Sequence, residues 1–221
     1  MSGHTAHDGS LTTHVLYRNE RLRQQLVVNF TRNGPISLFL FGNDPEGVTA
    51  RAIYQHWLGE RRWWQWTRQP VKTLPSDFSA LLHARHQPHH NVYQFEFTYR
   101  GQHTSSHFMK PIEIGKNWVT HSDDLLYLFP GGVFPYDLPL KNPRDIRVRE
   151  IMTKMWANFI ATGNPTPDES LGFKWEAVTE GGGLQHLALQ PDPVMVSDQR
   201  AEARDFLASV LTNIDYLQQD D

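Results

Sequence analysis

The segment Asn91–Tyr99, NVYQFEFTY, has the most regular strand pattern in the chain. Aromatic residues stand at positions 93, 95, 97 and 99 and alternate with valine, glutamine, glutamate and threonine. A period of two is typical of a β-strand, because successive side chains point to opposite faces of a sheet. The pattern therefore predicts a strand over residues 91–99, and Gly101 ends it.

Segments with helical periodicity lie on both sides of this strand. The most regular is Asp145–Ile160, where apolar residues recur every three or four positions and Gly163 stands where a C-terminal cap belongs. Pro45–Leu58 predicts a second helix, since Asp44 precedes its proline and Gly59 follows its last apolar residue.

Two further helices are expected nearer the ends of the chain. The first runs from about Ser10 to Phe30, and Asn33-Gly34-Pro35 then breaks the chain. The last helix carries an apolar set made of Phe206, Leu207, Val210, Leu211 and Ile214.

Short strands are expected at 187–189 and 194–196, whereas 83–90 and 102–117 have the composition of polar loops. Helices and strands thus alternate, which is typical of the α/β class. No stretch of linker composition interrupts the sequence, so we expect residues 1–221 to form a single unit.

Composition excludes several classes of protein and of site. Lys and Arg total 21 and Asp and Glu total 24, a net charge of 21 − 24 = −3, which argues against nucleic acid as the main partner. No run of 18 apolar residues exists, so no membrane span is expected. The absence of cysteine excludes thiolate nucleophiles and thiolate zinc sites.

Three segments in chain order carry a family resemblance. They are VYQFEFTY at 92–99, WVTHSDDLLYLF at 118–129 and WANFIATGNP at 156–165, with Trp175 downstream. Together they resemble the C-terminal half of the type-B carboxylesterase and cholinesterase family, most of all its insect carboxylesterases and their non-enzymatic relatives. The resemblance implies the C-terminal portion of an α/β-hydrolase fold, with an incomplete sheet and flanking helices.

The same resemblance implies two catalytic residues. The family orders its triad as Ser, then Asp or Glu, then His, which places His121 at the histidine and the acid in the slot His7-Asp8-Gly9. That acid is usually Glu, one methylene longer than Asp8, so the resemblance leaves open whether Asp8 reaches His121. No Gly-x-Ser-x-Gly occurs in the 221 residues, and Gly181-Gly182-Gly183 is expected to form a turn rather than an oxyanion loop.

Each candidate also has a purely structural interpretation. His121 could be a polar loop residue beside a strand end, and Asp8 could belong to a solvated terminus. Asp123 and Asp124 are expected at the start of a helix, where carboxylates interact favourably with the helix dipole, rather than as partners of His121.

Three other groups of side chains could form a site. Zinc or copper could be held by a loop with His83, His86, His89 and His90, or by His103 and His107. We favour solvated loops and expect neither a metal nor a cofactor. The indoles of Trp63, Trp64 and Trp66 could line an acyl pocket, but packing is the favoured interpretation.

The leading interpretation is a partial carboxylesterase-type serine hydrolase that carries the acid and histidine of the triad and lacks the nucleophilic serine. The complete family protein would hydrolyse carboxylic esters, whereas this chain alone is expected to be nearly inert, because loss of the serine lowers turnover about a millionfold. The alternative is a non-catalytic esterase-like protein of adhesion or the extracellular matrix, with a protein partner.

The resemblance also bears on location and assembly. It implies a secreted or extracellular glycoprotein, and Asn29-Phe30-Thr31 fits the N-glycosylation rule, although the N-terminus has no signal-peptide pattern. The chain is expected to be the second half of a larger hydrolase or the product of a truncated gene model. Because the nucleophile strand lies centrally in this fold, the chain expressed alone is expected to expose a strand edge and to associate.

Overall fold

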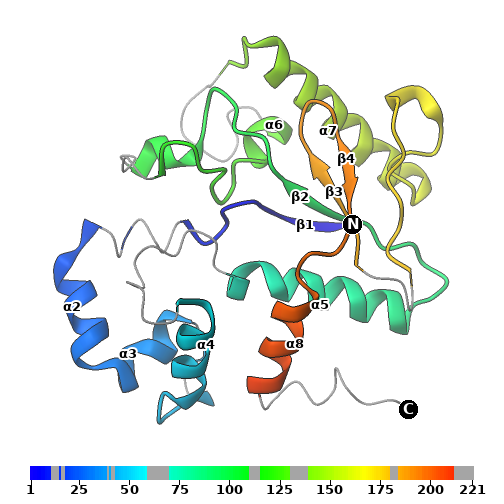
Figure 1. Ribbon diagram of the computed structural model, residues 1–221. Coiled ribbons are helices and arrows are strands. Elements are labelled where there is room, and N and C mark those ends of the chain that lie inside the picture. Colours follow the sequence, from blue (N-terminus) through cyan, green and yellow to red (C-terminus); the bar gives the residue numbers. More distant parts are fainter. Residues whose placement is uncertain are drawn as a thin grey trace.

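The computed structural model describes residues 1–10, 15, 18–38, 40, 43–58, 70–109, 115–129, 139–179 and 184–211. Its centre is a four-stranded sheet in the order β1-β2-β3-β4 (Figure 1). The strands are β1 (Ser2–Thr5), β2 (Gln94–Phe97), β3 (His186–Leu189) and β4 (Val194–Val196). The first three are parallel, and β4 runs antiparallel to β3.

The aromatic face of β2 packs under a long helix. Phe95 and Phe97 belong to a core cluster with apolar residues of α7 (Pro143–Thr162) and with Trp175. The Phe95 and Trp156 rings meet edge to face at 5.3 Å. The period-two prediction is confirmed, although the hydrogen-bonded strand is shorter than 91–99 because only Gln94–Phe97 pairs continuously with its neighbours.

The polar side chains of β2 lie on the opposite face of the sheet, where they contact charged residues rather than solvent. Helices α5 (Pro70–His86) and α8 (Ala201–Val210) cover this side, opposite α7 (Figure 1). Gln94 donates to Asp77 on α5 over 3.0 Å, and Glu96 accepts from Arg200, which directly precedes α8, over 2.9 Å. The sheet is therefore apolar on the α7 side and polar on the α5 side.

A second apolar cluster joins α2 (Glu20–Val28), α3 (Phe30–Ser37), α4 (Val48–Leu58) and α8. The helix predicted from Pro45 is confirmed, but it begins at Val48. The Asp44 carboxylate accepts from the N–H groups of Thr49 and Ala50 at 3.1 and 2.8 Å, and this caps the first turn.

Two local predictions near the N-terminus have separate outcomes. Of the helix expected over 10–30, Ser10, Val15 and Arg18 are helical and α2 begins at Glu20, while most of 11–17 lies outside the described residues. The break expected at Asn33-Gly34-Pro35 was misplaced, since these residues are part of α3. The chain instead breaks between α2 and α3, at Asn29. Gly34 leaves room for the Phe30 ring one turn earlier, since a Cβ atom at Gly34 would lie 2.8 Å from that ring.

The loop expected over 83–90 also begins later than predicted. His83–His86 form the last turn of α5, because Ala80 and Ala84 on the opposite side of this helix pack into a third cluster with Val178 and Leu184. The loop expected over 102–117 contains the 3-10 helix η3 (Ser105–Met109).

Helix α7 fits its prediction best. Gly163 caps it with φ of +74°, the left-handed conformation that favours glycine. The remaining short elements are α6 (Leu125–Leu128) and η5 (Glu169–Leu171). The strands expected at 187–189 and 194–196 are confirmed as β3 and β4, and the last helix as α8 up to Val210, whereas Ile214 lies outside the described residues.

The observed architecture is the predicted α/β class, a mixed sheet with helices on both faces. Gly3 leaves room for the Phe95 ring to lie over β1, because a Cβ atom there would be 2.3 Å from that ring. Within the described part of the chain, β1 forms its ladder with β2 alone. The described helices include none that is both long and apolar enough to cross a bilayer.

Candidate active site

The structure brings together two loops that are far apart in sequence. One follows β1 and carries Asp8, and the other carries His121. His7 and Thr120 form an isolated parallel bridge between them. The His7 N–H donates to the Val119 carbonyl over 2.9 Å, and the Val119 N–H donates to His7 Nδ1 over 3.1 Å. These bonds hold the loops side by side beyond the carboxyl end of β1.

Asp8 and His121 meet across this junction. His121 Nδ1 lies 2.8 Å from Asp8 Oδ1, which also accepts from the Thr5 hydroxyl over 3.1 Å. The Asp8 side chain is 17% exposed and the His121 side chain 55% exposed. The shorter acid therefore reaches the imidazole. Asp8 is not a solvated terminus, whereas His121 is an exposed residue in a turn and its ring contacts that acid.

The electrostatics of the pair decide where its proton lies. Burial raises the pKa of Asp8, but the hydrogen bonds from His121 and Thr5 and the charge of His121 outweigh burial, so the pKa lies below 3.8. Asp8 is thus ionised at neutral pH and can only accept hydrogen bonds. His121 consequently carries its proton on Nδ1, and Nε2 is the basic nitrogen of the neutral ring.

Asp123 has a role that the sequence did not reveal. Its side chain is buried, and its carboxylate accepts from the N–H groups of Ser105 and Thr120 at 2.6 and 2.8 Å. Neither donor belongs to α6, so the expected helix-start role is wrong for the Asp123 carboxylate. Asp124 does occupy the N-cap position of α6, although its side chain makes no capping hydrogen bond.

Hydroxyl groups complete the surroundings of Asp123. Thr104 donates to both carboxylate oxygens at 2.9 and 2.8 Å, and the Thr120 hydroxyl lies 3.0 Å from Oδ1. Burial raises the pKa of Asp123 even though these donors oppose the rise. The available signal was the run Thr104-Ser105-Ser106, three small hydroxyl residues in an expected loop that are all buried in the structure.

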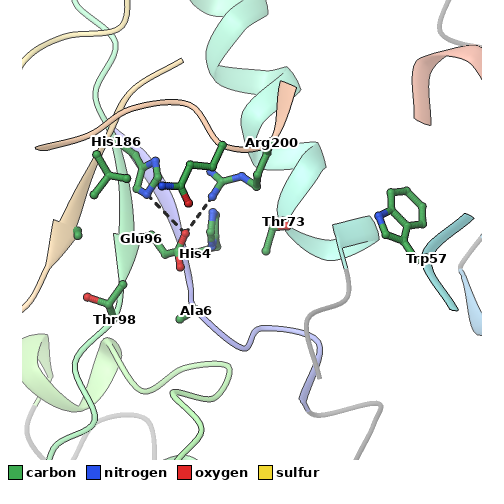
Figure 2. Close-up of a pocket in the computed structure, with 11 residues that line it drawn as sticks. His4, Ala6, Trp57, Thr73, Glu96, Thr98, His186 and Arg200 are labelled. Carbon is green, nitrogen blue, oxygen red and sulfur yellow. Dashed lines mark hydrogen bonds and ion pairs between the residues drawn. The ribbon is translucent and has the colours of Figure 1, made fainter. Parts of the chain in front are cut away.

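A cavity of about 440 Å³ lies on the polar face of the sheet, and neither Asp8 nor His121 lines it. In Figure 2, His186 and Arg200 are both joined to Glu96, at 3.6 and 2.9 Å. Ala6, Trp57 and Val196 contribute apolar wall. Burial, followed by the charge of Arg200, lowers the pKa of His186, so this imidazole is neutral near pH 7.

The other candidate groups give no site in the described chain. His83, His86, His89 and His90 are exposed, and His107 lies 3.4 Å from Arg100. Among the described residues, no three His, Asp or Glu side chains are grouped so that they could hold a metal ion. Trp63, Trp64 and Trp66, and the expected turn at Gly181–Gly183, lie outside the described residues.

Comparison with known proteins shows the family of this chain. The model of the carboxylesterase family matches residues 1–207. The chain belongs to the carboxylesterase family. The match includes both Asp8 and His121, and it confirms the resemblance seen in the sequence.

Relatives of this carboxylesterase-family chain include two insect proteins. It is 36% identical over 92 residues to glutactin of Drosophila melanogaster, and 33% identical over 89 residues to juvenile hormone esterase of Tribolium castaneum. These matches cover 41% and 38% of this chain. They span only 8% of glutactin and 15% of the esterase, so the chain matches a small part of each relative.

Solved structures share the fold. Juvenile hormone esterase from Manduca sexta, with OTFP covalently attached, aligns with a TM-score of 0.67 at 18% identity, over 94% of this chain and 40% of that one. PNB esterase aligns with a TM-score of 0.52 at 18% identity, over 78% and 32%. The fold is therefore that of the esterases, and the four-stranded sheet is an incomplete version of it.

Proposed function

We propose that the chain supplies the acid and the histidine of a carboxylesterase-type serine hydrolase site, with residues 1–221 acting as one unit. The observation that carries this proposal is the 2.8 Å contact between His121 Nδ1 and Asp8 Oδ1. An ionised carboxylate on one ring nitrogen fixes the tautomer, so the other nitrogen carries the lone pair that a general base needs.

In this role His121 takes the proton of a hydroxyl nucleophile through Nε2 and later returns it to the leaving alcohol. Asp8 keeps the ring oriented and stabilises the imidazolium that forms between the two steps. Thr5 supports Asp8 by donating its hydroxyl to Oδ1 over 3.1 Å. The substrates that we propose are carboxylic esters of modest polarity.

The serine and the oxyanion donors belong, in this proposal, to the portion of the relatives that this chain does not match. The 221 residues contain no Gly-x-Ser-x-Gly. The same fact, with Asp8 in place of the usual Glu, favours the second candidate, a non-catalytic adhesion or matrix protein. We also propose that the protein is secreted, a proposal supported by the exposed acceptor residue Asn29.

The test begins with the coding sequence upstream of Met1 and with the longest product that it encodes. We expect this product to contain Gly-x-Ser-x-Gly, to hydrolyse p-nitrophenyl esters and to be labelled by a fluorophosphonate, whereas the present chain is not labelled. Asp8→Asn should lower kcat about 10⁴-fold, and His121→Gln should lower it about 10⁶-fold.

His83→Gln, an exposed imidazole on α5, is the matched control and should leave kcat unchanged. Three outcomes would overturn the esterase proposal: a coding sequence that starts at Met1, another residue in place of the serine, or activity that survives His121→Gln. The second outcome would favour the adhesion or matrix protein.

A further inference from the structure

The backbone beside His121 has a conformation that needs external support. Ser122 follows His121 directly and has φ of +70°, in the left-handed region that residues other than glycine rarely adopt. Within the described chain it is the only non-glycine residue with a positive φ. Such a conformation persists where surrounding contacts impose it.

Those contacts come from a buried group of small polar residues. Ser105 donates its hydroxyl to the His121 carbonyl over 2.6 Å, and its oxygen lies 2.6 Å from the Thr120 hydroxyl. Ser105 and Thr120 are both buried. The carbonyl of His121 is thus fixed from η3, and the residue before it is fixed by the same hydroxyl.

Asp123 lies at the centre of this group. Its carboxylate accepts from four donors, namely two on Thr120, one on Ser105 and one on Thr104. The backbone is closed around it, because the Asp123 N–H donates back to the Thr120 carbonyl over 3.0 Å. Residues 120–123 therefore form a turn whose interior is filled by the Asp123 carboxylate.

We infer that Asp123 is a positioning residue, which holds the backbone of His121 through Ser105 and Thr120 so that the imidazole meets Asp8. The inference rests on the proposed function for the importance of that contact. Asp123 does not act on the imidazole directly, because both of its oxygens are occupied by hydrogen-bond donors from Thr104, Ser105 and Thr120.

The test measures the Asp8–His121 contact without requiring catalysis. The reporter is the ¹³C carboxyl resonance of Asp8, followed by NMR from about pH 2 to about pH 6 in the full chain. In the parent chain the hydrogen bond from His121 keeps the pKa of Asp8 below 3.8 although burial raises it. Asp123→Asn places an amide N–H group against the hydrogen-bond donors that surround Asp123, so the turn should shift and the His121 ring should leave Asp8. The pKa of Asp8 should then rise to 3.8 or above.

Asp44→Asn is the matched control, since Asp44 is also a buried carboxylate that accepts from two backbone N–H groups, but it caps α4. It should leave the pKa of Asp8 unchanged. If Asp123→Asn does not fold, Ser105→Ala provides the same test, because it removes the hydroxyl that binds the His121 carbonyl.

The positioning role is overturned if the pKa of Asp8 stays where it is in the folded variant, or if Asp44→Asn raises it equally. Failure of the proposed function is a separate result. A longer product without esterase activity would leave the titration of Asp8 in this chain, and its dependence on Asp123, fully measurable.

Discussion

Arg200 holds Asp77 with two nitrogens, Nε at 2.8 Å from Oδ2 and Nη2 at 2.9 Å from Oδ1, across 123 residues of sequence. Asp77 is fully buried on α5 and also accepts from Gln94 of β2 and from Arg204 of α8. One carboxylate therefore joins two helices to the polar face of the sheet. Asp198 completes the group by accepting from Arg204 over 3.0 Å.

Asp77→Asn should be strongly destabilising. The substitution leaves two arginine side chains in a largely buried setting without their shared carboxylate, and breaking a buried ion pair from one side typically costs about 3–5 kcal/mol. Denaturant unfolding measures the loss. Asp192→Asn is the control, because the Arg147–Asp192 pair is exposed, and it should stay within about 0.5 kcal/mol of the parent chain. Equal losses in the two variants would contradict this account.

Trp175 anchors the opposite, apolar face. It is buried, its Nε1–H donates to the Gln94 carbonyl over 3.1 Å, and its ring meets Tyr93 and Phe95 edge to face. Trp175→Ala should lower the free energy of unfolding by about 3–5 kcal/mol, since a large buried aromatic ring is removed. Phe129→Ala, at a residue that is 54% exposed, should lower the free energy of unfolding much less. Thermal melts of the two variants measure the difference, and the reverse order would contradict the assignment of the core.

The local patterns of the sequence predicted the elements whose stability is local. The alternation in Asn91–Tyr99 gave β2, the three-four rhythm with Gly163 gave α7, and Asp44 before an apolar run gave α4. In each case the deciding residues are neighbours in the chain. The Asp8 slot and His121 required the family resemblance, since nothing local distinguishes one of 12 histidines.

The elements that were misplaced depend on distant contacts. Helix α5 extends to His86 because Ala84 is buried in a cluster with Leu184, a residue far along the chain. Asp77 is buried because Arg204 reaches it across 127 residues, and Asp123 because Thr104 and Ser105 reach it across 19 and 18 residues. Charge buried in this way resembles surface charge in the sequence, so neither composition nor periodicity could predict it.

His186 should make the chain less stable in mild acid. Burial, followed by the charge of Arg200, puts its folded pKa below 6.5, so below pH 6.5 the unfolded chain binds a proton that the folded chain does not. Stability is therefore lost as pH falls from 6.5 toward the folded pKa. His186→Gln removes this titration, so the difference in Tm between about pH 7.5 and pH 5.5 should shrink relative to the parent chain. A difference that stays the same or grows would exclude this role.

Asp8 should also make the chain less stable in acid, over a lower range of pH than His186. Its folded pKa lies below 3.8, so the contribution is complete above pH 3.8 and is lost as pH falls through the folded value. Asp8→Asn abolishes the ionised partner of His121, and the variant should consequently lose less stability than the parent chain between about pH 5 and pH 3. Urea midpoints at the two pH values measure this, and parallel losses would mean that the pair adds nothing to the folded state.

Asn29 should carry a glycan when the chain passes through the secretory pathway. It lies exposed between α2 and α3, its side chain makes no capping hydrogen bond, and Thr31 two residues later is also exposed. An acceptor asparagine must be reachable from solvent, and this junction meets that condition. Expressed in insect cells behind a signal peptide, the chain should gain mass that peptide N-glycosidase removes.

Asn29→Gln and Thr31→Ala should each abolish the added mass, because both residues belong to the acceptor triplet. Asn164 is the matched control: it stands in Asn164-Pro165-Thr166, where the central proline blocks the reaction, so Asn164→Gln should leave the glycosylated mass unchanged. Mass spectrometry of the secreted chain distinguishes these outcomes. A secreted, folded chain at its unmodified mass would remove Asn29 as support for the secretion proposal.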